Sequence, residues 1–291
     1  MMEKMNKNES LLARGAQWLA CWLTCDNEPI PEAQLSDFER ICQKIQSADV
    51  ILIEGRSRAG RVISTITKSA WTHAALYIGR LSDIQDLSLL NHVKKYYSGA
   101  ADEQLVIESI MDKGVIISPL SQYKLEHVRI CRPKGLPKEE AHKVIHHAMQ
   151  LIGRPYDKQQ IFDLARFLFP WFLLPGRWRS SLFSYQAGEY TKLTCSLLIA
   201  EAFMSISYPI LPFVRKDSIR GYEFIRRNVR LFTPKDFDYS PYFDIIKYPI
   251  IELSDDVPYT TIPWNEELMS NDTEGIVTKK VNETERNESF H

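Results

Sequence analysis

The stretch "SAWTHAALYIG", residues 69–79, places a histidine at the start of a short apolar run that ends in glycine. The run from Ala74 to Ile78 has the length of a β-strand and is bounded by polar or small residues, as strands usually are. A lone histidine in such a run is usually a satisfied core residue. A catalytic role for His73 is therefore indicated only if other reactive side chains are found to accompany it.

Four further stretches share the strand-like composition, being short, rich in β-branched residues and bounded by Gly, Pro or polar clusters. They are "DVILIEG" (49–55), "QLVIESI" (104–110), "GVIISPL" (114–120) and "HVRICRP" (127–133). Together with residues 72–79 they predict a mainly antiparallel sheet. The polar residues 81–103 lie between the strands predicted at 72–79 and 104–110, and they are expected to form a surface excursion.

Residues 137–153, "PKEEAHKVIHHAMQLIG", predict a helix that starts at a proline followed by two glutamates and ends at a glycine. His142 and His146 lie four residues apart and could share a metal ion. The apolar stripe of this helix leaves both histidines toward its other side, and the sequence offers no third ligand, so a solvated face is favoured. The sequence "CWLTC" (21–25) lacks a second ligand pair, and no metal or cofactor is predicted.

Cys195 lies in "YTKLTCSLLIAEAFMSI" (190–206), which predicts a polar turn opening a helix. In the first turn of a helix, N–H groups without helical partners and the positive dipole end favour thiolate over thiol. A thiolate nucleophile also needs an imidazole to carry protons and an acceptor that orients the imidazole. His73 and Glu108 each lie in a strand-like run and supply these two types of side chain.

A histidine in one strand, a glutamate in the next and a cysteine later at a helix start resemble the circularly permuted NlpC-type papain-like cysteine hydrolases, the YiiX-like enzymes in particular. The resemblance rests on motifs in this order: "DVILIEG", "SAWTHAALYIG", "LVIESI", "GVIISPL", "GRPYD", "TCSLLIAEAF" and "LFTPKDFDYSP". It implies an α+β papain-like fold, with an antiparallel sheet packed against helices and the nucleophile at a helix N-terminus. It further implies Cys195 as nucleophile, His73 as base, Glu108 as the group orienting it and Tyr156 near the oxyanion site. Asp112 is the alternative orienting group.

The implied activity is that of a cysteine-dependent hydrolase or acyltransferase acting on an amide or ester bond through an acyl-thioester. Peptides, cell-wall fragments and lipid-like molecules are all candidate substrates. The alternative is a catalytically silent papain-like scaffold that binds a lipid or a protein partner.

Composition limits the partners and the compartment. The chain of 291 residues has a formal net charge of −1, so no overall basic field favours a nucleic-acid partner. Its five cysteines are odd in number and sparse, which favours a reducing, cytoplasmic compartment over a disulfide framework. No apolar run is long enough to span a bilayer. Residues 11–23 and the aromatic and basic residues 166–185 suit peripheral membrane contact, and packing against the protein's own core explains both stretches as well.

Three segments are expected from these patterns. Residues 1–47 form an N-terminal helical segment, and residues 48–250 the permuted papain-like catalytic domain. Residues 251–291 are polar, charged and poor in periodic apolar positions, which predicts a disordered tail.

Overall fold

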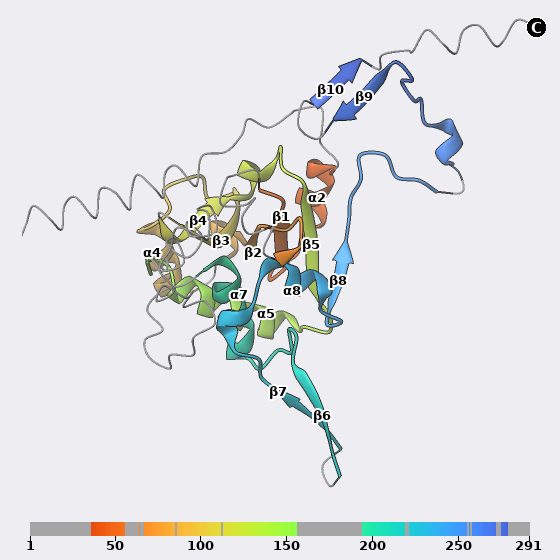
Figure 1. The fold of residues 1–291 in the computed structure, drawn as a ribbon. Coiled ribbons are helices and arrows are strands. Elements are labelled where there is room, and N and C mark those ends of the chain that lie inside the picture. Colours follow the sequence, from red (N-terminus) through yellow and green to blue (C-terminus); the bar gives the residue numbers. More distant parts are fainter. Residues whose placement is uncertain are drawn as a thin grey trace, which may run out of the picture.

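The central element is a six-stranded antiparallel sheet in the strand order β4-β3-β2-β1-β5-β8 (Figure 1). The computed structural model describes residues 36–55, 64, 67–84, 86–111, 113–155, 194–218, 221–254, 256, 258–271 and 275–278. The strands of this sheet are β1 (Val50–Ile53), β2 (His73–Arg80), β3 (Gln104–Ile110), β4 (Gly114–Pro119), β5 (Val128–Pro133) and β8 (Phe243–Ile246). The predicted antiparallel sheet is confirmed, and β8 extends it at one edge.

The central strands are apolar on both faces because both faces of the sheet are covered. In β1, Leu52 faces one core cluster, whereas Ile51 and Ile53 face another. The same alternation runs through β2 and β3, so the strands read as continuous apolar runs. This burial on both sides is why such short segments could be recognised from sequence.

Helices cover the two faces unequally. The helices are α2 (Phe38–Lys44), α4 (Leu87–Lys94), α5 (Lys138–Gln150), α7 (Cys195–Ser205) and α8 (Pro234–Tyr239). α5 and α7 contact each other, and α7 also contacts β2 and β3. On the opposite face, Ile41 of α2 belongs to the second core cluster. The α+β arrangement of an antiparallel sheet with helices is the predicted one.

The polar residues 81–103 differ from the expected surface excursion. They contain a short 3₁₀ helix, η2 (Leu81–Asp83), and α4, whose Asp86 caps the helix by accepting hydrogen bonds from the N–H groups of Ser88 and Leu89. Val93 is completely buried and α4 packs on α5. The insertion thus contributes to the main core, which its polar composition concealed.

The remaining elements lie outside the main sheet. The strands β6 (Phe213–Asp217) and β7 (Gly221–Ile225) form one two-stranded sheet, and β9 (Leu268–Asn271) and β10 (Gly275–Thr278) form another. The 3₁₀ helices are η3 (Leu120–Tyr123), η6 (Val229–Leu231) and η7 (Tyr259–Thr261). β9 and β10 fall within the segment expected to be a polar tail, and the three segment boundaries stay predictions. Among the helices of the described ranges, none has both the length and the apolar character needed to cross a bilayer.

Candidate active site

Cys195 is the first residue of α7, as its sequence context predicts. Thr194 caps the helix, and its Oγ1 accepts a hydrogen bond from the N–H of Leu197 at 3.3 Å. The following side chains are buried, including Leu198 and Phe203, and they fix the helix against the sheet. Cys195 itself is only partly buried, so its sulfur lies at the positive end of a firmly packed helix.

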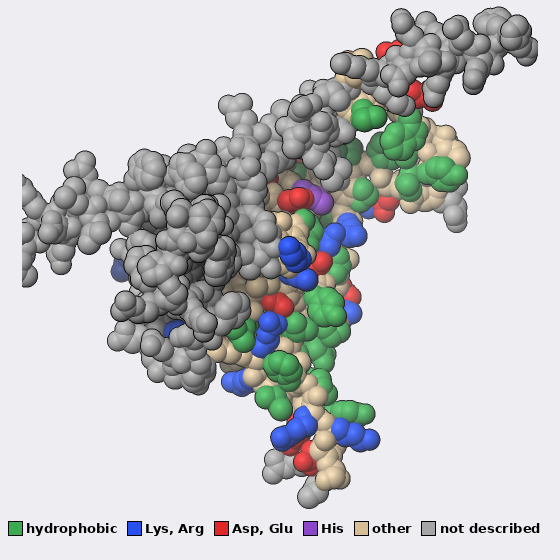
Figure 2. Space-filling view, in the orientation of Figure 1, with side chains coloured by type: hydrophobic (Ala, Val, Ile, Leu, Met, Phe, Trp, Pro, Cys, Tyr) green, Lys and Arg blue, Asp and Glu red, His purple; other side chains and the backbone are tan. Residues whose placement is uncertain are grey.

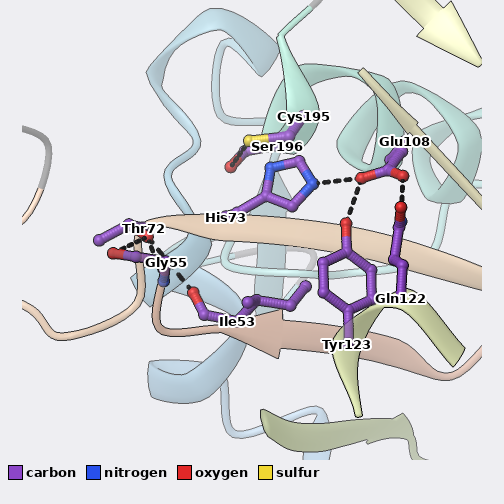
Figure 3. Close-up of polar contacts among 9 residues, drawn as sticks. All are labelled: Ile53, Gly55, Thr72, His73, Glu108, Gln122, Tyr123, Cys195 and Ser196. Carbon is purple, nitrogen blue, oxygen red and sulfur yellow. Dashed lines mark hydrogen bonds and ion pairs between the residues drawn. The ribbon is translucent and has the colours of Figure 1, made fainter. Parts of the chain in front are cut away.

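His73 is the first residue of β2 and pairs with Ile53 at the end of β1. The residue before it is tied to β1 as well, since Thr72 Oγ1 accepts a hydrogen bond from the N–H of Gly55 at 2.8 Å. Against the opposing effect of burial, the imidazole of His73 and the backbone of Ala74 both favour the charged form of the Cys195 sulfur and so lower its pKa. Figure 3 shows the imidazole between the cysteine of α7 and a glutamate of β3.

That glutamate is Glu108, whose side chain has no exposed surface. Its Oε2 lies 2.6 Å from Nε2 of His73, which leaves Nδ1 as the ring nitrogen available to the sulfur. Leu76 pairs with Ile107 across β2 and β3, so His73 and Glu108 both lie on the other face of the sheet, diagonally placed. The register shift between Tyr77 and Gly79 falls beyond this point and does not disturb it.

The buried carboxylate of Glu108 has two further partners from η3. Gln122 Nε2 donates to Oε1 at 2.7 Å, and the hydroxyl of Tyr123 donates to Oε2 (Figure 3). A buried charge without such donors would be very costly. Sequence reasoning missed both residues. Their only signal is a place directly after the strand next to Glu108, which no short motif marks.

The interactions among Cys195, His73 and Glu108 favour the charged form of each side chain. Burial lowers the pKa of His73, but the hydrogen bonds and charges of Cys195 and Glu108 outweigh it and raise that pKa to about 10. Burial raises the pKa of Glu108, but the hydrogen bond and charge of His73, with hydrogen bonds from Ser118 and Tyr123, lower it to about 2. Burial likewise raises the pKa of Cys195, and His73 more than reverses this, so the pKa falls below its usual value. The arrangement therefore favours the thiolate of Cys195 over the thiol, and it places the imidazole between the sulfur and the carboxylate.

A metal centre has no support in the described ranges, which contain no group of three His, Cys, Asp or Glu side chains able to hold an ion. His146 faces Asp86 at 3.9 Å, and His142 is exposed on α5. Several predicted features lie outside the described residues: Tyr156, Asp112 and the two stretches 11–23 and 166–185.

Two comparisons with known proteins found similarity to this chain. Residues 44–165 match a family described as a permuted papain-like amidase enzyme, YaeF/YiiX, C92 family. Among solved structures, the metalloprotein YiiX from Escherichia coli O157:H7 is similar, with a TM-score of 0.42 and 16% identity, covering 70% of this chain and 98% of that one. No curated protein matches the chain. The resemblance stated from the sequence is confirmed, and with it the expectation of a papain-like cysteine hydrolase of the amidase type. The matched range includes His73 and Glu108 but ends before Cys195.

Proposed function

We propose, from the premise that residues 44–165 match the permuted papain-like amidases, that Cys195, His73 and Glu108 are the catalytic triad of this cysteine hydrolase. The observation that carries the proposal is the short contact between Nε2 of His73 and Oε2 of Glu108, 2.6 Å, with the Cys195 side chain on the other side of the same imidazole (Figure 3). A silent scaffold has no need for a buried carboxylate held by three side chains beside a thiol of lowered pKa.

In the proposed reaction, the Cys195 thiolate attacks the carbonyl carbon of an amide, and the electron pair of the C=O bond moves to the oxygen. The proposed donors to that oxyanion are the N–H groups of Cys195 and Ser196 at the start of α7, because they are the nearest in the chain to the reacting sulfur. His73 as imidazolium then gives its proton to the leaving nitrogen, the C–N bond breaks and an amine departs. An acyl-thioester remains on Cys195.

The second half of the reaction reverses the roles of the imidazole. Neutral His73 takes a proton from water, the hydroxide attacks the thioester carbonyl, and the C–S bond breaks to release a carboxylic acid. Glu108 stabilises the imidazolium each time it forms and keeps Nδ1 directed at the sulfur. The proposed substrates are amides or esters of small size: a peptide, a cell-wall fragment or a lipid-like molecule.

Alkylation by iodoacetamide, followed by peptide mapping, tests the nucleophile directly. An ordinary thiol reacts roughly a hundredfold more slowly at pH 6 than at pH 8, because its thiolate fraction falls. We expect the rate for Cys195 to fall less than that of an ordinary thiol between pH 8 and pH 6, and His73→Gln to restore the ordinary dependence. Cys131 is the internal reference, since it is buried and burial raises the pKa of its thiol.

Two results would contradict the assignment. One is an ordinary pH dependence of the alkylation of Cys195 in the wild-type protein. The other is hydrolysis of any amide substrate at the wild-type rate by Cys195→Ala, which would place the reaction elsewhere.

A further inference from the structure

The β6–β7 hairpin projects from the body of the protein beyond α5 and α7 (Figure 1). Its base is fixed to the domain by two arginines that follow β7. Arg227 Nη1 donates to Asp236 Oδ1 at 2.9 Å, and Arg226 Nη2 donates to Ser207 Oγ at 2.6 Å. The ring of Phe224 also contacts that of Tyr242. The hairpin is therefore held in a defined position while most of its length faces solvent.

The exposed side chains of the hairpin are unusually apolar, and they occupy both faces. Phe213 pairs with Ile225 on one face, and Val214 pairs with Phe224 on the other, where Tyr222 also lies. All five are between 42% and 73% exposed. A strand that only covers its own core exposes one polar face. This hairpin instead offers apolar surface in two opposite directions.

Basic residues are interleaved with these apolar ones. Residues 213–225 contain three Lys and Arg and two Asp and Glu, a formal charge of +1 in a chain whose total is −1, and Arg226 follows at the base of the hairpin. Figure 2 shows basic and hydrophobic side chains, with some acidic ones, on the surface of the projecting hairpin. Arg215 is paired with Glu223 across the strands at 2.7 Å, and Lys216 lies opposite Tyr222. The local excess of positive charge complements an anionic surface.

We propose that the β6–β7 hairpin docks this protein on an anionic lipid membrane. The aromatic and aliphatic side chains enter the interfacial region, where Tyr and Phe are favoured, and the basic side chains meet lipid phosphates. Lipids surround an inserted hairpin on both sides, which fits apolar residues on both of its faces, whereas a protein groove covers one. The strands are too short to span, so their outer backbone groups stay among hydrated headgroups.

This docking surface is separate from the proposed triad. Cys195 is the first residue of α7, and the hairpin follows the last turn of the same helix, so the two lie toward opposite ends of it. The hairpin therefore localises the protein and takes no part in the reaction. Changes in it should leave the alkylation of Cys195 by iodoacetamide unchanged.

Sedimentation of the full chain with lipid vesicles tests the proposal. We expect binding to phosphatidylcholine vesicles that contain about a third phosphatidylserine, little binding to pure phosphatidylcholine, and release as salt rises from about 0.1 M to about 1 M. The double variant Lys216→Glu/Tyr222→Ser should bind about tenfold more weakly, because it loses one aromatic anchor and reverses one charge.

The matched control is Lys94→Glu/Tyr239→Ser, which makes the same two changes at exposed positions of α4 and α8. It should bind like the wild type, because it leaves the hairpin unchanged. Its net charge changes by the same amount as that of the hairpin variant, so a difference in binding reports the position of the two changes. Circular dichroism checks that each variant is folded, and Lys216→Glu alone gives the same comparison if the double variant is not.

Three outcomes would overturn the proposal. The wild-type protein fails to bind either type of vesicle, or both double variants lose binding equally. The third outcome is a wild-type dimer in solution that the hairpin variant converts to a monomer, which would make the hairpin a surface for self-association.

Discussion

Nε2 of His73 lies 2.6 Å from Oε2 of Glu108, a carboxylate that has no exposed surface. Burial strengthens this contact, because the carboxylate accepts hydrogen bonds from Gln122 and Tyr123 and cannot exchange its partners for water. Cys195 completes the series on the other side of the imidazole. Four predictions depend on these contacts and on the packing around them.

Glu108→Gln should lower kcat by about tenfold to a thousandfold while the protein stays folded. The amide can still orient the imidazole through its oxygen, but it lacks the charge that stabilises the imidazolium. Steady-state kinetics on an amide substrate, with circular dichroism as the check on folding, measure the effect. An unchanged kcat would remove Glu108 from the triad.

The stabilisation that the His73–Glu108 pair gives should be greatest between pH 4.5 and pH 6.5, the ordinary pKa values of the two groups. Folding raises the pKa of His73 to about 10, so this stabilisation is lost as pH rises from 6.5 through 10. Folding lowers the pKa of Glu108 to about 2, so it is also lost as pH falls from 4.5 through 2.

The Tm difference between wild type and Glu108→Gln, measured across this pH range, reports the stabilisation. It should be widest near pH 5.5, inside the window set by the two ordinary pKa values, and should narrow on both sides. A difference that widens steadily from neutral to alkaline pH would contradict the assignment of an imidazolium to His73.

Tyr123→Phe should lower kcat about tenfold with little change in KM, because it removes a hydrogen bond to the charged form of Glu108. The acid limb of the pH–rate profile should move to higher pH, since the pKa of Glu108 rises when this donor is lost. Tyr77→Phe is the matched control. Tyr77 is buried on the same face of the sheet, and its hydroxyl accepts a hydrogen bond from Gln104 at 2.9 Å, away from the triad.

Equal losses in the two tyrosine variants would mean that Tyr123 serves general stability. A loss confined to Tyr123→Phe, with the shifted acid limb, identifies it as a residue that positions Glu108.

Val93→Ala should destabilise the protein by about 2 kcal/mol, because it leaves a small cavity where α4 packs on the main core. Leu87→Ala, on the same helix, is the control, since Leu87 is 73% exposed. Urea unfolding measures both variants. If the two cost the same, α4 is not part of the core.

The elements recognised from sequence are those whose own residues determine them. β1, β2 and β3 are apolar on both faces over most of their length, and the start of α7 combines a threonine cap with an apolar run. The order of His73, Glu108 and Cys195 along the chain was equally readable. Gln122 and Tyr123 were not, because their contact with Glu108 depends on how η3 turns back over β3. The burial of Val93 depends in the same way on the packing of α4 against α5, which local polarity does not reveal.

The position of Cys195 in the chain has a consequence for synthesis on the ribosome. Cys195 is translated 122 residues after His73, by which time β1 to β5 have all been made. At about 5–20 residues per second this delay is roughly 6–25 s. His73 and Glu108 are therefore synthesised well before the sulfur, and the three side chains can come together only after α7 has been made.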